Sequence, residues 1–279
     1  MSRTLTVAAV NFVMRPLKDF EDFADQVTGL LSLTDGADLV VFPEMFTTGL
    51  ITLCDTWPFD ALDGLVELAA FESRVDQFFA QLAAERRQFI LAGSTLSATG
   101  DGFRNVATLH GPEGIVLRHS KTQLLPVEKE FVTERGSAFN VVDIGKARVG
   151  VNICYEIQFP EGATALVDQG AEVIICPALT TSERGFWRVR HAAHARAVEN
   201  QVYVVHSAAG GQPKHALPGG FARTAIISPC DWPWENVNGV IAETATNASD
   251  VVITELDLDA LEKARDSGET RTFRDRRQF

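Results

Sequence analysis

Apolar and polar positions in the first hundred residues follow two different periods. Short β-branched runs lie at 5–12, 37–44 and 89–96, which is typical of buried strands. Between them, residues 21–33 and a long stretch within 61–87 repeat apolar side chains every three to four positions, as amphipathic helices do. This alternation of strands and helices predicts an α/β layered fold.

The middle of the chain has another pattern. Residues 105–121 are typical of two strands about a Gly-Pro-Glu-Gly turn, and residues 139–156 of two more about Gly145-Lys146. Because tight turns join antiparallel neighbours, part of the sheet is expected to be mixed or antiparallel.

The second half returns to alternation. Helices are expected at about 160–169 and 186–201, and strands at 171–178 and 202–209. A further strand at 222–229 precedes a last pair of strands and a short helix at 257–265.

A single domain is expected over residues 1–279, because no linker rich in Gly, Ser or Pro divides the two halves. The Gly- and Pro-rich stretch 210–220 has the composition of a mobile loop within that domain. Residues 262–279 are expected to form a C-terminal arm, whose basic end is more typical of a docked or solvated segment than of a binding motif.

Composition narrows the classes of partner. The chain has 279 residues, 46% of them hydrophobic, with 25 Lys and Arg against 37 Asp and Glu, so its formal net charge is -12. That field would repel nucleic acid and anionic membrane, and it favours small neutral or polar partners.

The cysteines and the N-terminal sequence favour a reducing cytoplasm. The first residues lack the pattern of a secretory signal, and no uncharged stretch is long enough to span a bilayer. Cys54, Cys154, Cys176 and Cys230 are scattered, so neither a disulfide scaffold nor a zinc knuckle is expected.

No metal and no cofactor are expected. His191 and His194 lie three apart on a predicted helix, but without a third ligand a helix surface is the better interpretation. No glycine-rich phosphate loop, dinucleotide fingerprint or G-x-S-x-G occurs, which disfavours nucleotide enzymes and serine hydrolases.

Three predicted strands end at chemically useful side chains, namely Glu44, Lys121 and Cys154. In α/β sheets, sites form where strands end and loops begin. A carboxylate base, an ammonium and a thiol are sufficient for acyl transfer, because a thiol needs a base and a nearby cation to react as the thiolate. The alternatives are three solvated strand ends, with Cys154 a small buried hydrophobe.

These residues lie in motifs that resemble those of the nitrilase superfamily, the carbon-nitrogen hydrolases. The three motifs are "VVFPEMFTTGL", "LRHSKTQLLPVEKEFVTERG" and "GVNICYEIQFPE", and "HARAVENQVYVVHSA" also resembles a helix of that family. The resemblance extends from about Leu5 to Leu261, and it implies a four-layer αββα sandwich.

The resemblance also implies roles for these residues. Glu44 would be the general base, Lys121 would stabilise the oxyanion, and Cys154 would be the nucleophile that forms a thioester. Glu128 would be a second glutamate that positions substrate and lysine, with Glu130 as its competitor.

Neighbouring residues receive supporting roles from the same resemblance. Tyr155 would lend its backbone N–H to the oxyanion, and Glu156 would support the turn structurally. A substrate pocket would be bordered by the loop Ala178, Leu179, Thr180 and Thr181. Departures from the family motifs, such as "HSK" at 119–121 and Arg135-Gly136, leave the subfamily open.

The expected function is hydrolysis of a non-peptide carbon–nitrogen bond in a small amide or carbamoyl compound, without a cofactor. A true nitrilase is the alternative, and a catalytically inactive binding or scaffold member is another. The resemblance further implies a homodimer or a higher homo-oligomer that pairs through helices after Cys154 and near 191–198.

Overall fold

The computed structural model describes residues 2–54, 65–213 and 219–276. The strands of the first sheet, in spatial order, are β5 (Gly114–Ser120), β4 (Phe103–Gly111), β3 (Phe89–Ala98), β2 (Leu39–Val41), β1 (Thr4–Met14) and β12 (Asp250–Asp257). From the end of β1 a second sheet continues through β9 (Tyr203–Gly211), β8 (Val173–Leu179), β7 (Arg148–Val151) and β6 (Val141–Asp143), with β10 (Ala225–Ile227) on β9 and β11 (Val240–Glu243) on β10.

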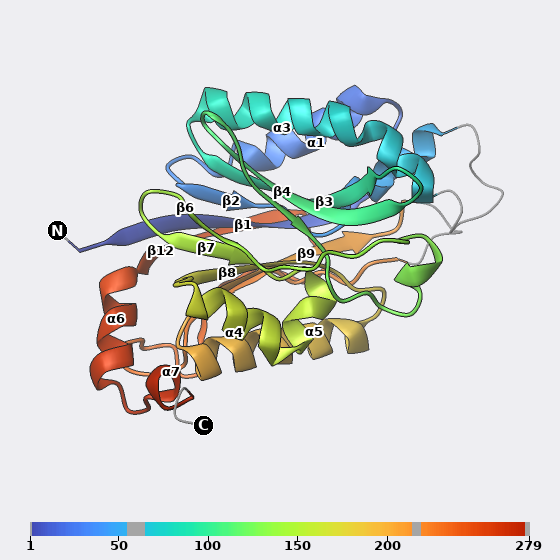
Figure 1. The fold of residues 1–279 in the computed structure, drawn as a ribbon. Coiled ribbons are helices and arrows are strands. Elements are labelled where there is room, and N and C mark those ends of the chain that lie inside the picture. Colours follow the sequence, from blue (N-terminus) through green and yellow to red (C-terminus); the bar gives the residue numbers. More distant parts are fainter. Residues whose placement is uncertain (1, 55–64, 214–218, 277–279) are drawn as a thin grey trace.

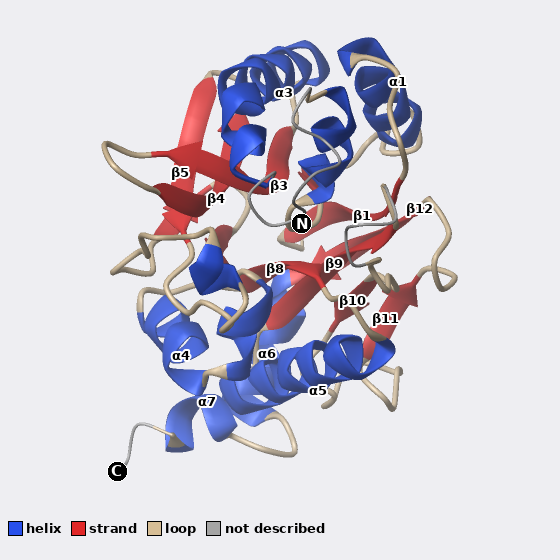
Figure 2. Cartoon of the chain, turned by 90° about the vertical axis from the view of Figure 1, so that its right-hand side faces the viewer, coloured by secondary structure: helices blue, strands red, loops and turns tan. Residues whose placement is uncertain are grey.

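Helices cover the outer faces of the two sheets (Figure 1). Over the first sheet lie α1 (Phe20–Leu31) and α3 (Glu72–Arg86), and over the second lie α4 (Pro160–Asp168) and α5 (Glu183–Asn200). Figure 2 shows the same order of layers from the side. The α/β class is therefore confirmed, and the layers are arranged as an αββα sandwich.

The remaining helices of the described residues are short. Four of these are 3-10 helices: η1 (Phe46–Leu53), η2 (Val66–Phe71), η3 (Glu128–Glu130) and η4 (Cys154–Gln158). The chain then ends in α6 (Leu258–Ser267) and α7 (Thr272–Asp275). No helix among the described residues is long and apolar enough to cross a membrane.

Strand β1 shows why the sequence forms these layers. Its successive side chains point to opposite faces. Leu5, Val7 and Ala9 belong to the core that includes residues of both sheets, whereas Val10 and Phe12 belong to the core beneath α1 and α3. Both faces of the strand are buried, which accounts for its nearly continuous apolar sequence.

Strand direction brings the predicted site residues to one edge. β1 is parallel to β2 and to β9, β2 is parallel to β3, and β9, β8 and β7 are parallel. Two antiparallel steps, from β3 to β4 and from β4 to β5, return β5 to the direction of β3. The strands that precede Glu44, Lys121 and Cys154 thus all end at the same side of the molecule.

Some elements differ from the sequence-based expectation. The long helix expected within 61–87 is η2 followed by α3, and its residues 61–64 lie outside the described residues. The strand expected at 37–44 is only β2, because the chain leaves the sheet after Val41 and returns in a single bridge between Glu44 and Ser94. Of the loop expected at 210–220, residues 214–218 are not described.

The basic C-terminal segment is docked as far as the structure describes it. Thr272 Oγ1 donates to the Val198 carbonyl on α5, and the Phe273 ring packs against the core. Arg276 pairs with Asp168 at 3.0 Å. Residues 277–279 of this tail lie outside the described residues.

Candidate active site

Lys121 is the centre of a buried ion cluster. Its Nζ lies 2.7 Å from Glu44 Oε1 and 2.6 Å from Glu128 Oε1, and its side chain is 1% exposed. Burial alone would lower the pKa of Lys121, but the carboxylates of Glu44 and Glu128 outweigh it and raise this pKa above the ordinary value. The ammonium therefore stays charged throughout the neutral range.

Backbone and amide donors fix the two carboxylates. Glu44 Oε1 also accepts from Asn105 Nδ2 at 3.0 Å, and Glu44 Oε2 accepts from the Leu179 N–H at 2.9 Å. Glu128 Oε2 accepts from the Leu125 N–H at 2.7 Å. Asn105 was not singled out in the sequence, where the only signal was an asparagine at the start of an apolar strand.

Glu128 and Glu130, the two candidates for the second glutamate, lie in different surroundings. Glu128 begins η3 and is buried against Lys121, whereas Glu130, at the end of the same short helix, is exposed. Burial raises the pKa of Glu128 and the charge of Lys121 only partly opposes this rise.

Cys154 follows β7 and begins η4 with an unusual backbone. Its φ is +47°, a left-handed conformation that is rare for residues other than glycine and that concentrates at functional sites. Its Sγ lies 3.6 Å from the Leu179 carbonyl oxygen, to which the thiol donates. The peptide groups on either side of Leu179 Cα thus contact both Cys154 and Glu44.

Burial keeps the Cys154 thiol protonated at rest. Its side chain is 2% exposed, and burial together with the charge of Glu44 raises the pKa of this thiol well above its ordinary value. Lys121 opposes the shift but does not cancel it. A reaction of this thiol as a nucleophile would therefore require a base that takes its proton.

Glu156 links the turn before Cys154 to the end of β5 and to the residue that follows Lys121. Its carboxylate accepts from the Ile153 N–H at 2.6 Å, from the Thr122 N–H at 2.6 Å and from Thr122 Oγ1 at 2.7 Å. His119 Nε2 lies 2.8 Å away. The histidine of the unusual "HSK" sequence is thus the partner of this buried carboxylate.

Two glycines allow the close backbone approaches on which the cluster depends. Gly93 has φ +54°, and a Cβ there would lie 1.9 Å from the Pro43 carbonyl oxygen, next to Glu44. At Gly136, whose N–H donates to the Lys121 carbonyl, a Cβ would lie 2.0 Å from the Ser120 carbonyl oxygen.

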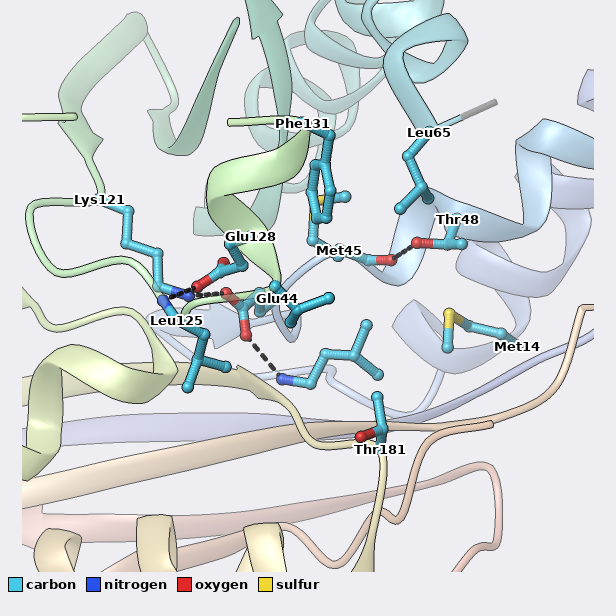
Figure 3. A pocket seen from close by; sticks show the side chains of 12 residues that line it. Met14, Glu44, Met45, Thr48, Leu65, Lys121, Leu125, Glu128, Phe131 and Thr181 are labelled. Carbon is cyan, nitrogen blue, oxygen red and sulfur yellow. Dashed lines mark hydrogen bonds and ion pairs between the residues drawn. The ribbon is translucent and has the colours of Figure 1, made fainter. Parts of the chain in front are cut away.

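A cavity of about 130 Å³ opens onto this cluster (Figure 3). Its lining residues are Met14, Glu44, Met45, Thr48, Leu65, Lys121, Leu125, Val127, Glu128, Phe131, Leu179 and Thr181. Leu179 and Thr181 of the expected border loop are among them. Ala178 is buried within β8 opposite Ala208, and Thr180 Oγ1 donates to the Phe221 carbonyl, so neither lines the cavity. Cys154 and Tyr155 do not line it either.

Cys176 lies next to Cys154 and Glu44, whereas His191 and His194 lie on α5. Cys176 is a fully buried residue of β8, as its strand pattern predicts. His191 is exposed on α5 and His194 is half-buried there. Within residues 2–54, 65–213 and 219–276 no group of three or more His, Cys, Asp or Glu side chains is arranged to hold a metal ion.

Comparison with known sequences gives a family match over almost the whole chain. The model of the family described as carbon-nitrogen hydrolase matches residues 6–266. The probable hydrolase YhcX of Bacillus subtilis is 31% identical over 278 residues, which are 98% of this chain and 53% of that protein. The chain therefore spans about half the length of this relative.

Two further relatives are closer in length. The nitrilase of Pyrococcus abyssi is 31% identical over 245 residues, covering 87% of this chain and 86% of that protein. The (R)-stereoselective amidase of a Pseudomonas species is 31% identical over 234 residues, with coverages of 82% and 76%.

The fold also matches solved structures. The crystal structure of Saccharomyces cerevisiae Nit3, a member of branch 10 of the nitrilase superfamily, aligns with a TM-score of 0.78 at 22% identity and covers 96% of this chain and 95% of that one. At this identity the likeness establishes the common fold.

Proposed function

Because the chain belongs to the carbon-nitrogen hydrolase family, within the nitrilase superfamily, we propose that it hydrolyses a small amide or carbamoyl compound through a thioester on Cys154. The observation that carries the proposal is the arrangement of Lys121 between two carboxylates beside a buried, protonated thiol. The amidase among its relatives supports an amide as the substrate.

In the first step, Cys154 Sγ attacks the carbonyl carbon while the thiol proton passes to the Glu44 carboxylate. The new S–C bond pushes the carbonyl π electrons onto oxygen. An ammonium has three N–H donors, and two of those on Lys121 go to Glu44 and Glu128. The third stabilises the oxyanion, together with the Tyr155 N–H.

In the second step, the C–N bond breaks and the proton held by Glu44 passes to the leaving nitrogen, so ammonia or an amine departs. Glu44 then takes a proton from water, and the resulting hydroxide attacks the thioester carbon. The S–C bond breaks, the carboxylic acid product forms, and the sulfur regains its proton from Glu44. Glu128 keeps Lys121 in place throughout, since it binds Nζ on a second side.

The remaining expectations concern the setting of the enzyme. We propose a single-domain protein of the cytoplasm, with no nucleic acid, membrane or cofactor partner, in keeping with its net charge of -12. We also propose a homodimer or higher homo-oligomer, which is supported by the exposed apolar side chains of Trp187 and Val198 on α5.

Ammonia release from a panel of simple amides and their matched nitriles tests this function. Intact-mass measurement should detect an acyl adduct on the wild-type protein, and Cys154→Ala should abolish both the adduct and turnover. Cys230→Ala removes an exposed thiol and serves as the matched control with unchanged activity. Turnover of nitriles alone would assign a true nitrilase, and turnover that persists in Cys154→Ala would contradict the thioester mechanism.

A further inference from the structure

The cavity has a charged floor and apolar walls. Lys121, Glu44 and Glu128 lie at its base, whereas the surrounding side chains are almost all hydrocarbon or thioether (Figure 3). The apolar wall is formed by Met14, Met45, Leu65, Leu125, Val127, Phe131 and Leu179. A substrate that presents its carbon–nitrogen bond to the floor must therefore place its acyl group against this wall.

The wall offers little to a charged acyl group. Thr48 Oγ1 already donates to the Met45 carbonyl at 2.5 Å, which leaves Thr181 as the other hydroxyl-bearing residue of the lining. In the described part of the chain, Lys121 is the cation of the lining, and it is already paired with two carboxylates. A carboxylate on the substrate would lose its hydration without gaining a cation, and it would also be repelled by Glu44 and Glu128.

The volume matches a small acyl group. A dry apolar cavity of about 150 Å³ holds a molecule of benzene. The volume here is about 130 Å³, which is enough for an acyl group of about six non-hydrogen atoms.

We propose that the substrates are amides of short, uncharged, apolar acyl groups, held by the wall of Met14, Met45 and Phe131 above the Lys121 cluster. This inference rests on the proposed function, because it assumes that the carbon–nitrogen bond is cleaved at the floor of this cavity. Specificity then comes from contact between the acyl group and the apolar wall, and from the exclusion of substrates that carry a carboxylate.

Matched pairs of amides test the exclusion of charge. Butanamide and succinamic acid have the same chain length and differ only in a terminal methyl or carboxylate, and pentanamide and glutaramic acid form a second pair. With the full chain at pH 7.5, kcat/KM is expected to be at least about a hundredfold higher for the neutral member of each pair. An equal or higher kcat/KM for the carboxylated member would overturn the inference.

A chain-length series tests the wall itself. From acetamide to octanamide, kcat/KM is expected to peak at about three to five acyl carbons. Phe131→Ala enlarges the cavity and should move this optimum to longer chains, whereas Phe103→Ala removes a half-buried ring outside the lining and should leave it unchanged. An optimum at acetamide, or one that moves equally in both variants, would contradict the assigned wall.

The two proposals fail in different ways. Faster ammonia release from the carboxylated amides, with an acyl adduct that is lost in Cys154→Ala, would overturn the substrate class and leave the proposed function intact. Absence of ammonia and of any adduct with every amide would overturn the proposed function, and the substrate class with it.

Discussion

Replacement of Lys121 by methionine tests whether one ammonium holds two buried carboxylates together. Lys121 Nζ contacts Glu44 at 2.7 Å and Glu128 at 2.6 Å, and the three side chains are almost fully buried. Methionine is unbranched like lysine but carries no charge. In Lys121→Met the two carboxylates face each other without a cation and without their shortest hydrogen bonds.

Removal of one partner from a buried ion pair destabilises a protein by about 3–5 kcal/mol, and we expect Lys121→Met to lower the free energy of unfolding by this amount at pH 7.5. The loss should depend on pH with a definite sign. Burial already raises the pKa of Glu128, and loss of Lys121 removes the opposing charge, so this pKa rises further. A raised carboxyl pKa favours the folded state at low pH, and that contribution is lost as pH increases through the raised pKa.

The free energy of unfolding should be measured by urea titration at pH 5.5 and pH 8, at one protein concentration, for the wild-type protein and the variant. The gap between them should be larger at pH 8. Lys129→Met, at an exposed lysine of the same segment, is the matched control and should change stability by less than about 0.5 kcal/mol. In Lys121→Met/Glu128→Gln, removal of one carboxylate charge should restore part of the loss. A cost below about 1 kcal/mol, or a gap independent of pH, would refute the reasoning.

Three further variants test individual contacts. In Glu128→Gln the side chain keeps one oxygen, so its NH2 group must face either the Leu125 N–H or Lys121 Nζ. Lys121 is then misplaced or a donor is left unpaired, and kcat/KM should fall by about a hundredfold. Glu130→Gln, at an exposed position, should leave kcat/KM unchanged. Cys154→Gly should be more stable to urea than Cys154→Ala by about 1 kcal/mol, because glycine adopts φ +47° freely; equal stability would argue against strain. Glu156→Gln should lower the free energy of unfolding by about 1–3 kcal/mol, because one amide group then faces backbone donors, and an unaltered urea midpoint would contradict this.

The alternation of apolar patterns along the sequence was sufficient to predict an α/β fold, whereas the four-layer αββα arrangement was implied by the resemblance to the family. A run of apolar residues indicates a buried strand, and the polar residue that follows the run indicates roughly where the chain leaves the sheet. Glu44, Lys121 and Cys154 each follow a strand in this way, and the common direction of β2, β5 and β7 brings them to one edge. The chemistry of the cluster could therefore be proposed before its geometry was known.

The partners of these residues could not be predicted in the same way. Asn105 lies 61 residues from Glu44, and the Leu179 N–H lies 135 residues from it, so both contacts depend on how the strands are paired and packed. The backbone N–H of Leu179 leaves no trace in the side-chain pattern. His119 was visible as an unusual residue before Lys121, but its contact with Glu156 spans 37 residues and needs the folded sheet.

The buried carboxyl groups of Glu156 and Glu128 have pKa values that are shifted in opposite directions, which indicates different roles. Burial would raise the pKa of Glu156, but the contact with His119 and the donors from Thr122 outweigh it, so this pKa is lowered. The pKa of Glu128 is raised, because burial and the nearby charge of Glu44 exceed the stabilisation by Lys121. Glu156 therefore stays ionised at neutral pH and serves to hold the turn before Cys154. Glu128 and Glu44 share Lys121, so protonation of Glu128 as pH falls weakens the contact between Glu128 and the Lys121 ammonium. In the proposed mechanism, the fall in rate at acidic pH therefore reports the protonation of this cluster and not of Glu156.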